Sequence, residues 1–429
     1  MRVVRYGTPA WRRYREGLPR VAVARPAVER AVASILREVR SGGDRALVRL
    51  TARLDGVRLR PRDLRVPPAQ IRALARRAEP AVVDALRAMA RRIEDYHSRQ
   101  RDRGFRLRLG GGGRLEEQVS ALDSVGLYVP GGAGAYPSSV LMSAIPARVA
   151  GVPRIQVATP PRTLEASPAV AAALVLMGLE GSTFRVGGAQ AIAALAFGTA
   201  TIPAVAKIVG PGNAYVAAAK RQVRGVVEID QEAGPSEVVV LADQTADASW
   251  VAADLLAQAE HGSGDETAVL VTPSAALAAE VRRFLADGLE SVANAAAARR
   301  ALGRNGAVVL VRDLDEGVRA VNDLAPEHAQ IMTRGASALS SRIVAGAVFV
   351  GPWAPVAVGD YGIGPNHVLP TGGAARWSSP LSVRDFQRRQ SVVHMTAARL
   401  RRVADGMVRV AAAEGFRGHA RSLLVRLNG

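Results

Sequence analysis

The sequence of 429 residues contains no cysteine. Without thiols the chain forms no disulfide, holds no iron–sulfur cluster and offers no cysteine nucleophile. Any transition metal must therefore bind through imidazole, amide and carboxylate groups. That ligand set suits a catalytic zinc or manganese ion better than a structural zinc knuckle. The absence of cysteine also fits a reducing compartment such as the cytoplasm.

Lysine and aromatic residues are scarce, although the formal charge is +19. Lys207 and Lys220 are the only lysines, so arginine carries nearly all of the positive charge and is spread along the whole chain. Aromatic residues make up 4% of the sequence, too few for a platform on which bases stack. Because the basic residues are dispersed and not clustered for phosphate contacts, we expect no nucleic acid partner.

Long apolar runs are also missing from the sequence. The longest one, Ala169–Leu179, is shorter than the roughly 20 residues needed to span a bilayer. The arginine-rich N-terminus has no apolar stretch of the kind found in a secretory signal. These features predict a soluble, cytoplasmic protein with no membrane partner.

Short apolar strands alternate with alanine-rich helices over most of the chain. One such series runs from residue 125 to 209, and a second runs from residue 237 to 350. This alternation predicts mostly parallel, doubly wound sheets. Because single cores rarely exceed roughly 250 to 300 residues, we expect two α/β units with a break near residues 234–235. Helices are expected over the first hundred residues and again after Pro380.

Four of the six histidines lie in polar segments bounded by glycine or proline. Gln258 and His261 are three residues apart at the end of an expected helix, so one helix face presents both. They can grip one cation, or they can simply cap the helix end. Glu327 and His328 directly follow Pro326. A carboxylate beside an imidazole can act as an acid–base pair near neutral pH, or it can be an exposed pair without a role.

The densest of these segments is Gly359–Gly373, which is rich in glycine and carries Asp360 and His367. An ordered loop of this length is usually functional, so we expect it to form the wall of a pocket. Glu414 and His419 lie in the arginine-rich tail. Together the four segments suggest a metal-dependent active site. The two remaining histidines have no comparable carboxylate neighbours and are expected to be structural.

Two glycine-rich turns, at residues 130–139 and 209–215, each follow a strand and open a helix. Backbone N–H groups at such a position favour phosphate. Neither turn contains G-x-G-x-x-G, so the usual dinucleotide fingerprint is missing. Each turn by itself is a weak indication of nucleotide binding.

Taken in order, these segments resemble the histidinol dehydrogenase family, the enzymes of the last two steps of histidine biosynthesis. The resemblance extends over nearly the whole chain, more loosely over the first 120 residues and the last 40. The matching stretches are residues 125–152, 187–199, 207–243, 258–261, 325–328 and 346–392.

The resemblance implies two Rossmann-like, doubly wound α/β domains in an aldehyde-dehydrogenase-like arrangement. A helical N-terminal segment and a small helical C-terminal arm complete the implied fold. We expect an N-terminal arm (1–25), a discontinuous domain with the metal and catalytic residues (26–127 and 237–380), an NAD-side domain (128–236) and an arm exchanged in a homodimer (381–429). The family's domains lack the glycine fingerprint, which fits its absence here.

The resemblance also implies a role for individual residues. The ligands of one zinc ion per subunit fall on Gln258, His261, Asp360 and His419, the last supplied across the dimer interface. Glu327 and His328 fall on the catalytic acid–base pair. Substrate contacts fall on Ser236, Gln258, His261, His328, Asp360, His367, Glu414 and His419. NAD contacts fall on Tyr128, Gln190 and Asn213.

The implied activity is the NAD- and zinc-dependent, four-electron oxidation of L-histidinol to L-histidine through L-histidinaldehyde. Many aldehyde oxidations use a cysteine thiohemiacetal, which this chain cannot form, so we expect attack by water with the Glu-His pair as base. The alternatives are a dehydrogenase of another small alcohol such as a sulfonated diol, a zinc-dependent hydrolase, and an arginine-rich nucleic-acid-binding module. The chain departs from the family pattern at Gly262-Ser263, Gln231-Glu232, Val356 and Pro380.

Overall fold

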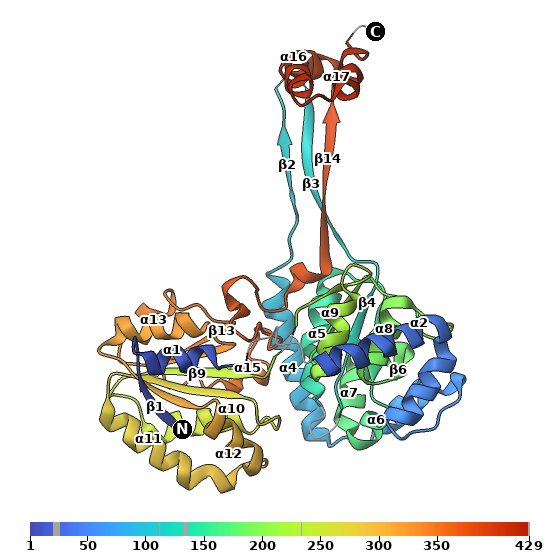
Figure 1. Ribbon diagram of the computed structural model, residues 1–429. Coiled ribbons are helices and arrows are strands. Elements are labelled where there is room, and N and C mark those ends of the chain that lie inside the picture. The colour runs from blue at the N-terminus through green and yellow to red at the C-terminus, as the bar shows by residue number, and fades with distance from the viewer. Residues whose placement is uncertain (20–25, 111, 132–135, 233, 428–429) are drawn as a thin grey trace.

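The computed structural model describes residues 1–19, 26–110, 112–131, 136–232 and 234–427. Two α/β lobes lie side by side, and a narrow ribbon rises from between them to a pair of helices (Figure 1). The predicted fold class, two α/β units with parallel sheets, is confirmed. Among the helices of the described residues, none is long and apolar enough to cross a membrane.

The first lobe is built on a fully parallel sheet of six strands. Their order is β1 (Arg2–Arg5), β11 (Ala307–Leu310), β10 (Thr267–Thr272), β9 (Glu237–Ala242), β12 (His328–Met332) and β13 (Ala347–Val350). One face is covered by α10 (Ala248–Ala259), α11 (Ala275–Gly288), α12 (Ala295–Arg304) and the short η3 (Leu289–Ser291). The other face is covered by α1 (Pro9–Glu16), α13 (Leu314–Leu324) and α14 (Ala336–Ser340). Because both faces are covered, the central strands are continuous apolar runs without alternation.

The second lobe is built on a parallel sheet of five strands. Their order is β6 (Thr183–Arg185), β5 (Ile155–Thr159), β4 (Val125–Tyr128), β7 (Lys207–Val209) and β8 (Glu228–Ile229). One layer holds α3 (Pro68–Ala75), α4 (Pro80–Ser98), α5 (Pro137–Ala150), α6 (Thr163–Ala166) and α7 (Pro168–Leu176). The other holds α2 (Pro26–Leu54), α8 (Gly188–Phe197) and α9 (Ala214–Val223), and η1 (Pro61–Asp63) and η2 (Glu180–Ser182) are short connections. The strand order reverses between β4 and β7, where open α/β sheets bind ligands beyond the carboxyl ends of the strands.

The packing of the N-terminal segments differs from the expected grouping. The sequence grouped residues 26–127 with the six-stranded lobe, but α2, α3 and α4 pack on the five-stranded sheet. The expected arm at residues 1–25 instead contributes the edge strand β1 and helix α1 to the six-stranded lobe, and residues 20–25 lie outside the described residues. The apolar face of a helix shows that it covers a core but not which sheet it covers.

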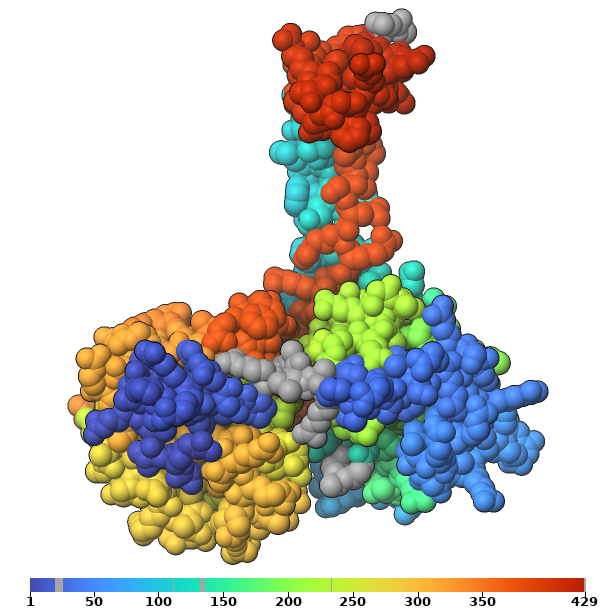
Figure 2. Space-filling view, viewed as in Figure 1, coloured from blue at the N-terminus to red at the C-terminus, as the bar shows by residue number. Residues whose placement is uncertain are grey.

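A three-stranded antiparallel ribbon connects the lobes to the C-terminal helices. Its strands are β2 (Phe105–Arg108), β3 (Gly113–Ala121) and β14 (Gln387–Met395), and α15 (Ala357–Asp360), η4 (Ala374–Arg376) and η5 (Val383–Phe386) precede β14 in the chain. At the far end, α16 (Ala397–Ala413) and α17 (Arg417–Leu424) pack on each other, well clear of both lobes (Figures 1 and 2). The prediction of helix throughout the segment after Pro380 was wrong for β14. Most of its residues are exposed on both faces, so no period-two apolar pattern marks the strand.

Candidate active site

The candidate acid–base pair lies where β12 begins. Helix α13 ends at Ala325, whose φ of 47° is the only left-handed value among the non-glycine residues that the structure describes. Pro326 follows and prevents the helix from continuing. The chain therefore turns sharply into the sheet, with Glu327 just before β12 and His328 as its first residue, and both side chains are buried.

Glu237, the first residue of the adjacent strand β9, holds both members of the pair. Its N–H donates to Glu327 Oε2 (2.9 Å), and its own Oε2 accepts from the N–H groups of Glu327 (3.3 Å) and Gly372 (3.1 Å). Its carbonyl oxygen lies 2.9 Å from His328 Nδ1. Because a carbonyl oxygen only accepts, this contact places the imidazole proton on Nδ1 and leaves Nε2 able to take up a proton.

Burial sets the protonation of the pair. It raises the pKa of Glu327 to about 8, although hydrogen bonds from the Glu237 N–H and the Ser236 hydroxyl act in the opposite direction. Burial lowers the pKa of His328, and the Asp360 carboxylate opposes this shift. A carboxyl group that titrates near neutrality beside a neutral imidazole is suited to proton transfer.

Gln258 and His261 come from the end of α10. His261 Nδ1 lies 3.0 Å from the carbonyl oxygen of Gln258 and 3.2 Å from that of Ala257, so its Nε2 faces away from the helix end. The charge of His261 affects the pKa values of four groups, which places it within electrostatic reach of the buried Glu327 and His328 and the partly exposed Asp360 and His367. The side-chain Nε2 of Gln258 is buried without a hydrogen-bond partner.

Hydrogen bonds within the loop after His261 hold its backbone in place. The buried carboxylate of Glu266 accepts from the N–H groups of Ser263 and Gly264, each at 2.8 Å. Gly262 has a φ of 104°, a backbone conformation that favours glycine. Gly262 and Ser263, where the chain departs from the family pattern, thus lie in a loop whose backbone is held by the buried Glu266 carboxylate.

Asp360 and His367 lie on the glycine-rich segment that the sequence singled out. Their side chains approach to 3.9 Å, between Asp360 Oδ1 and His367 Nδ1. Burial raises the pKa of Asp360, and His328 and His261 oppose this shift. Burial lowers the pKa of His367 to about 4, opposed by a hydrogen bond to the Asp360 backbone. His367 is therefore neutral at physiological pH and can act as a hydrogen-bonding group.

Asn366 anchors this segment to the five-stranded lobe. Its Nδ2 donates to the carbonyl oxygen of Met142 in α5 (2.6 Å), and its Oδ1 accepts from the Val368 N–H (2.9 Å). The same Nδ2 lies 3.4 Å from Nε2 of the buried His97. His97 therefore contacts the residue next to His367 and supports the loop that carries the candidate substrate contacts.

Three of the four predicted zinc ligands come from the same region, and their donor groups are of types that zinc accepts. Gln258, His261 and Asp360 offer an amide, an imidazole and a carboxylate, all acceptable zinc donors. The unpartnered amide of Gln258 supports this fit, since rotating it by 180° puts its carbonyl oxygen at the unsatisfied position. The Nδ1 contact of His261 with backbone carbonyls is the usual support of a ligating Nε2. Over the described ranges, no group of three or more His, Cys, Asp or Glu side chains could hold a metal ion.

Glu414 and His419 do not join the other predicted site residues within one chain. Glu414 directly follows α16 and His419 lies in α17, at the far end of the ribbon from the lobes (Figure 1). They line a common pocket of about 470 Å³, whose other lining residues are Gly406, Met407, Val410, Ala411 and Phe416. The predicted site is therefore split between the lobes and the tip of the ribbon.

The three predicted NAD contacts lie at the carboxyl ends of the five-stranded sheet. Tyr128 ends β4, and its hydroxyl oxygen accepts from the Gly188 N–H at 3.0 Å. Gln190 lies in the first turn of α8 and donates from Nε2 to Asp55 Oδ2 at 3.2 Å. Asn213 caps α9 by accepting from two of its backbone N–H groups. The three residues thus lie at the end of a strand or at the start of a helix that follows one, on the edge where open α/β sheets bind ligands.

A buried ion pair fastens the turn between β7 and α9. Gly210 has a φ of 118°, and a Cβ there would come within 2.2 Å of the Tyr128 carbonyl oxygen, so only glycine fits. Its N–H donates to Asp230 (2.8 Å), and its carbonyl oxygen accepts from Lys220 Nζ (3.0 Å). Lys220 and Asp230 form an ion pair with side chains that are each 2% exposed. Residues 132–135, in the other predicted glycine-rich turn, lie outside the described residues.

The segment beyond Asp230 is bonded to the loop that leads from the first lobe to the second. Gln231 Nε2 donates to the Leu369 carbonyl oxygen (2.6 Å), and the Gly234 N–H donates to Thr371 Oγ1 (2.7 Å). Gln231 and Gly234 are therefore both bonded to the segment 366–372 between the lobes. Gln231, one of the positions where the chain departs from the family pattern, makes the first of these two hydrogen bonds.

Sequence reasoning missed Glu237, Asp55 and the Lys220–Asp230 pair. Lys220 carried a signal, because it is one of only two lysines and stands in an alanine-rich helix. Glu237 opens a strand that is otherwise apolar, so its carboxylate also had to find partners in a buried position. Asp55 directly follows the C-terminal end of a helix, and nothing in the sequence links it to Gln190.

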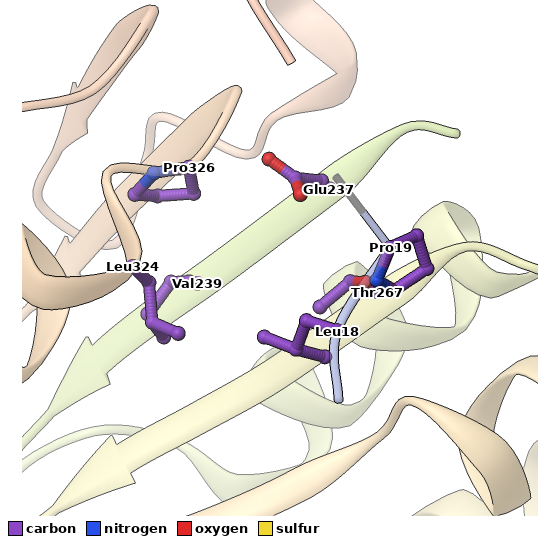
Figure 3. A pocket seen from close by; sticks show the side chains of 7 residues that line it. All are labelled: Leu18, Pro19, Glu237, Val239, Thr267, Leu324 and Pro326. Atoms are coloured by element: carbon purple, nitrogen blue, oxygen red, sulfur yellow. The ribbon is translucent and has the colours of Figure 1, made fainter. Parts of the chain in front are cut away.

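An enclosed space near the pair is too small for a substrate. It has a volume of about 10 Å³ (Figure 3), and its lining residues are Leu18, Pro19, Glu237, Val239, Thr267, Leu324 and Pro326. This is room for about one water molecule. Thr267 Oγ1, buried without a protein partner, can hydrogen-bond such a water.

The chain is similar to known proteins over nearly its whole length. The family model of histidinol dehydrogenase matches residues 18–427. Histidinol dehydrogenase of Nitrobacter winogradskyi is 48% identical over 402 residues, which cover 94% of this chain and 93% of that one. The enzyme of Gluconobacter oxydans is 47% identical over 419 residues, covering 96% and 97% of the two chains. The crystal structure of histidinol dehydrogenase from Elizabethkingia anophelis matches with a TM-score of 0.92 at 30% identity, covering 100% of this chain and 98% of that one. The chain belongs to the histidinol dehydrogenase family of oxidoreductases.

Proposed function

We propose that the protein catalyses the NAD- and zinc-dependent oxidation of L-histidinol to L-histidine through L-histidinaldehyde, as a cytoplasmic homodimer. The observation that carries this proposal is the buried Glu327–His328 pair, held by Glu237 and close to His261 and Asp360. Family membership supports the substrate, because the relatives are named histidinol dehydrogenases.

The first step is oxidation of the alcohol. Gln258, His261 and Asp360, with His419 of the partner subunit, would hold the zinc ion, which serves as a template for the amino and imidazole nitrogens of the substrate. Bound NAD⁺ supplies the hydride acceptor. His328 Nε2 takes the hydroxyl proton as the carbinol carbon gives up a hydride, and the aldehyde results. His328 is suited to this role because Glu237 holds its other proton on Nδ1.

The second step adds water to the aldehyde. Glu327 takes a proton from the attacking water, and His328 Nε2 returns the proton gained in the first step to the aldehyde oxygen, so a gem-diol forms. The gem-diol then gives up a hydride, which a second bound NAD⁺ would accept, and a hydroxyl proton, which His328 takes, and the carboxylic acid results. A carboxylate whose pKa is raised to about 8 is a far stronger base than an exposed one and matches neutral pH. Glu327→Gln is therefore expected to slow oxidation of the aldehyde more than oxidation of the alcohol, measured with each substrate separately. Equal losses in the two half-reactions would contradict this division of roles.

The remaining predicted contacts would hold the substrate around this pair. Ser236 bonds to Glu327, and the neutral His367 lies beside Asp360. The partner's Glu414 would add a carboxylate for the cationic amino group of histidinol. These groups would make the site selective for one small amino alcohol, since each polar atom of the substrate would have a specific hydrogen-bonding or charged partner.

The split of the predicted site between lobes and ribbon tip supports the homodimer. Met407, Val410 and Phe416 surround Glu414 and His419 at the tip and are 44%, 59% and 54% exposed in a single chain. Clustered apolar side chains of this kind indicate a surface that another protein covers. A second copy that places its tip over the lobes would cover them and complete the ligand set.

The direct test is NADH formation from L-histidinol. We expect two NADH for each histidinol oxidised, loss of activity on chelation and recovery when zinc is restored. Manganese in place of zinc serves as the metal control, and a sulfonated diol serves as the competing substrate. No NADH from histidinol, or a higher kcat/KM for the diol, would refute the proposed function.

Complementation tests the shared site. Glu327→Gln disables the lobe half of the site, and His419→Asn disables the tip half. Co-expressed, the two variants form hybrid dimers with one intact site, so a random mixture should recover about a quarter of the wild-type activity. Mixtures that stay as inactive as each variant alone would show that the site is not shared in this way.

A further inference from the structure

The five-stranded sheet has the order of the first five strands of a classical dinucleotide-binding domain, but it lacks one expected acid. In such domains β4 corresponds to the first strand and β5 to the second. An acidic residue about 20 residues beyond the first glycine-rich turn then binds the ribose 2′-hydroxyl of NAD, whereas an arginine there receives the 2′-phosphate of NADP. After β5 this chain continues with Pro160, Pro161 and Arg162. By this rule alone the sheet should favour NADP.

A carboxylate reaches the same place from another part of the chain. Asp55 directly follows α2, and the next residue, Gly56, accepts a hydrogen bond from Arg162 Nη2 at 3.4 Å. The charge of Arg162 acts on Asp55, so the two side chains are within electrostatic reach of each other. The end of α2 thus brings an acid to the arginine that follows β5.

The same carboxylate contacts the predicted NAD-side residues. Asp55 Oδ2 accepts from Gln190 Nε2 at 3.2 Å, and the charge of Asp55 also acts on Tyr128. Gln190 and Tyr128 are buried, whereas Asp55 is partly exposed and Arg162 is exposed. Asp55 is therefore oriented by a buried amide and is still partly exposed to a ligand.

We propose that Asp55 determines the preference of this enzyme for NAD over NADP. Its carboxylate accepts hydrogen bonds from the ribose hydroxyls of the adenosine and repels a 2′-phosphate. Arg162 supplies the positive charge that would bind that phosphate once the carboxylate is removed. The inference rests on the proposed NAD-dependent function and adds to it the residue that selects the coenzyme.

The test is direct binding of NAD⁺ and NADP⁺ to the full-length protein, measured by calorimetry, with histidinol oxidation by each coenzyme measured in parallel. We expect the wild type to bind NAD⁺ at least about 100-fold more tightly than NADP⁺, and Asp55→Asn to reduce this ratio by about 10-fold or more. In the Asp55→Asn background, Arg162→Ala should remove the gain in NADP⁺ affinity. Asp55→Ser serves as a second variant with the same expected direction.

Asp63→Asn is the matched control. Asp63 is a carboxylate a few residues further on that pairs with Arg60, so its removal should leave the coenzyme ratio unchanged. An unchanged ratio in both Asp55 variants would overturn this inference and leave the proposed function intact. Equal binding of NAD⁺ and NADP⁺ by the wild type would overturn it as well. A wild type that binds NAD⁺ but forms no NADH from histidinol would refute the proposed function alone.

Discussion

The protonation of Glu327 leads to a prediction about stability that needs no substrate. In the unfolded chain this carboxyl group titrates near 4.5, whereas burial in the folded protein raises its pKa to about 8. Below pH 4.5 both states carry the proton, so the burial has no electrostatic cost. As the pH rises from 4.5 through 8, the unfolded chain releases a proton that the folded chain retains, and the free energy of unfolding falls.

The size of the effect follows from the two pKa values. The interval between 4.5 and about 8 corresponds to about 5 kcal/mol, as an upper limit, at about 1.4 kcal/mol for each pH unit. Glu327→Gln removes the ionisable group and keeps an oxygen that can accept from the Glu237 N–H. The variant should therefore gain stability relative to the wild type as the pH rises, and the full difference should be present above pH 8.

The assay is thermal and urea unfolding of wild type and Glu327→Gln at pH 5 and pH 9, followed by circular dichroism after metal chelation. Chelation matters because a cation beside Asp360 would lower the pKa of Glu327. A change of about 5 kcal/mol shifts Tm by roughly 10–20 °C for a unit of this size. Glu290→Gln, at an exposed carboxylate of the same lobe, is the control and should show no such growth with pH. A constant difference between the two pH values, or a wild type that gains on the variant as pH rises, would refute the reasoning.

Three further predictions concern Glu237, Gly210 and the Lys220–Asp230 pair. Glu237→Ala keeps the backbone contacts to the pair but loses the side-chain oxygen that accepts from the Glu327 and Gly372 N–H groups, so it should lower kcat by about 100-fold with little change in KM, whereas Glu237→Gln should keep most of the activity; steady-state kinetics distinguish these outcomes. Gly210→Ala should cost about 3 kcal/mol or more and weaken NAD⁺ binding, since the new Cβ collides with the Tyr128 carbonyl oxygen; urea unfolding and calorimetry measure the two effects, and a fully stable variant would contradict the geometry. Lys220→Met leaves the Asp230 carboxylate buried and unpaired, which should cost about 3–5 kcal/mol in urea unfolding; a second change, Asp230→Leu, should recover part of the loss.

The sheets were predictable because burial on both faces makes their strands continuous apolar runs. β9 and β10 are of this kind, and the helices between strands show the matching 3.6-residue period. The ribbon was not predictable, because β14 has no buried face to impose a pattern. The placement of α2 to α4 was also missed, since an apolar helix face can cover either sheet.

The candidate site was predictable only in part. Glu327 and His328 stood out because both are polar residues directly after a proline. Glu237 did not, because it acts on this pair partly through its backbone N–H and carbonyl oxygen, which every residue other than proline has. The link between His419 and the lobes came only from the family resemblance. Nothing in the spacing of residues within one chain shows that a second copy provides a ligand.

The paired segments between the lobes restrict how this protein can move. Residues 230–232 and 234–236 are tied to residues 366–372 by side-chain bonds, and a buried ion pair joins Asp230 to Lys220 in α9. Two connecting segments that are hydrogen-bonded to each other resist bending far more than two segments that connect the lobes independently. Domain closure of the hinge type is therefore disfavoured at this crossing. Substrate and coenzyme would therefore bind between lobes whose relative positions are already fixed. Replacing the reduced coenzyme by NAD⁺ between the two proposed oxidations would then need no movement of the lobes around the bound aldehyde.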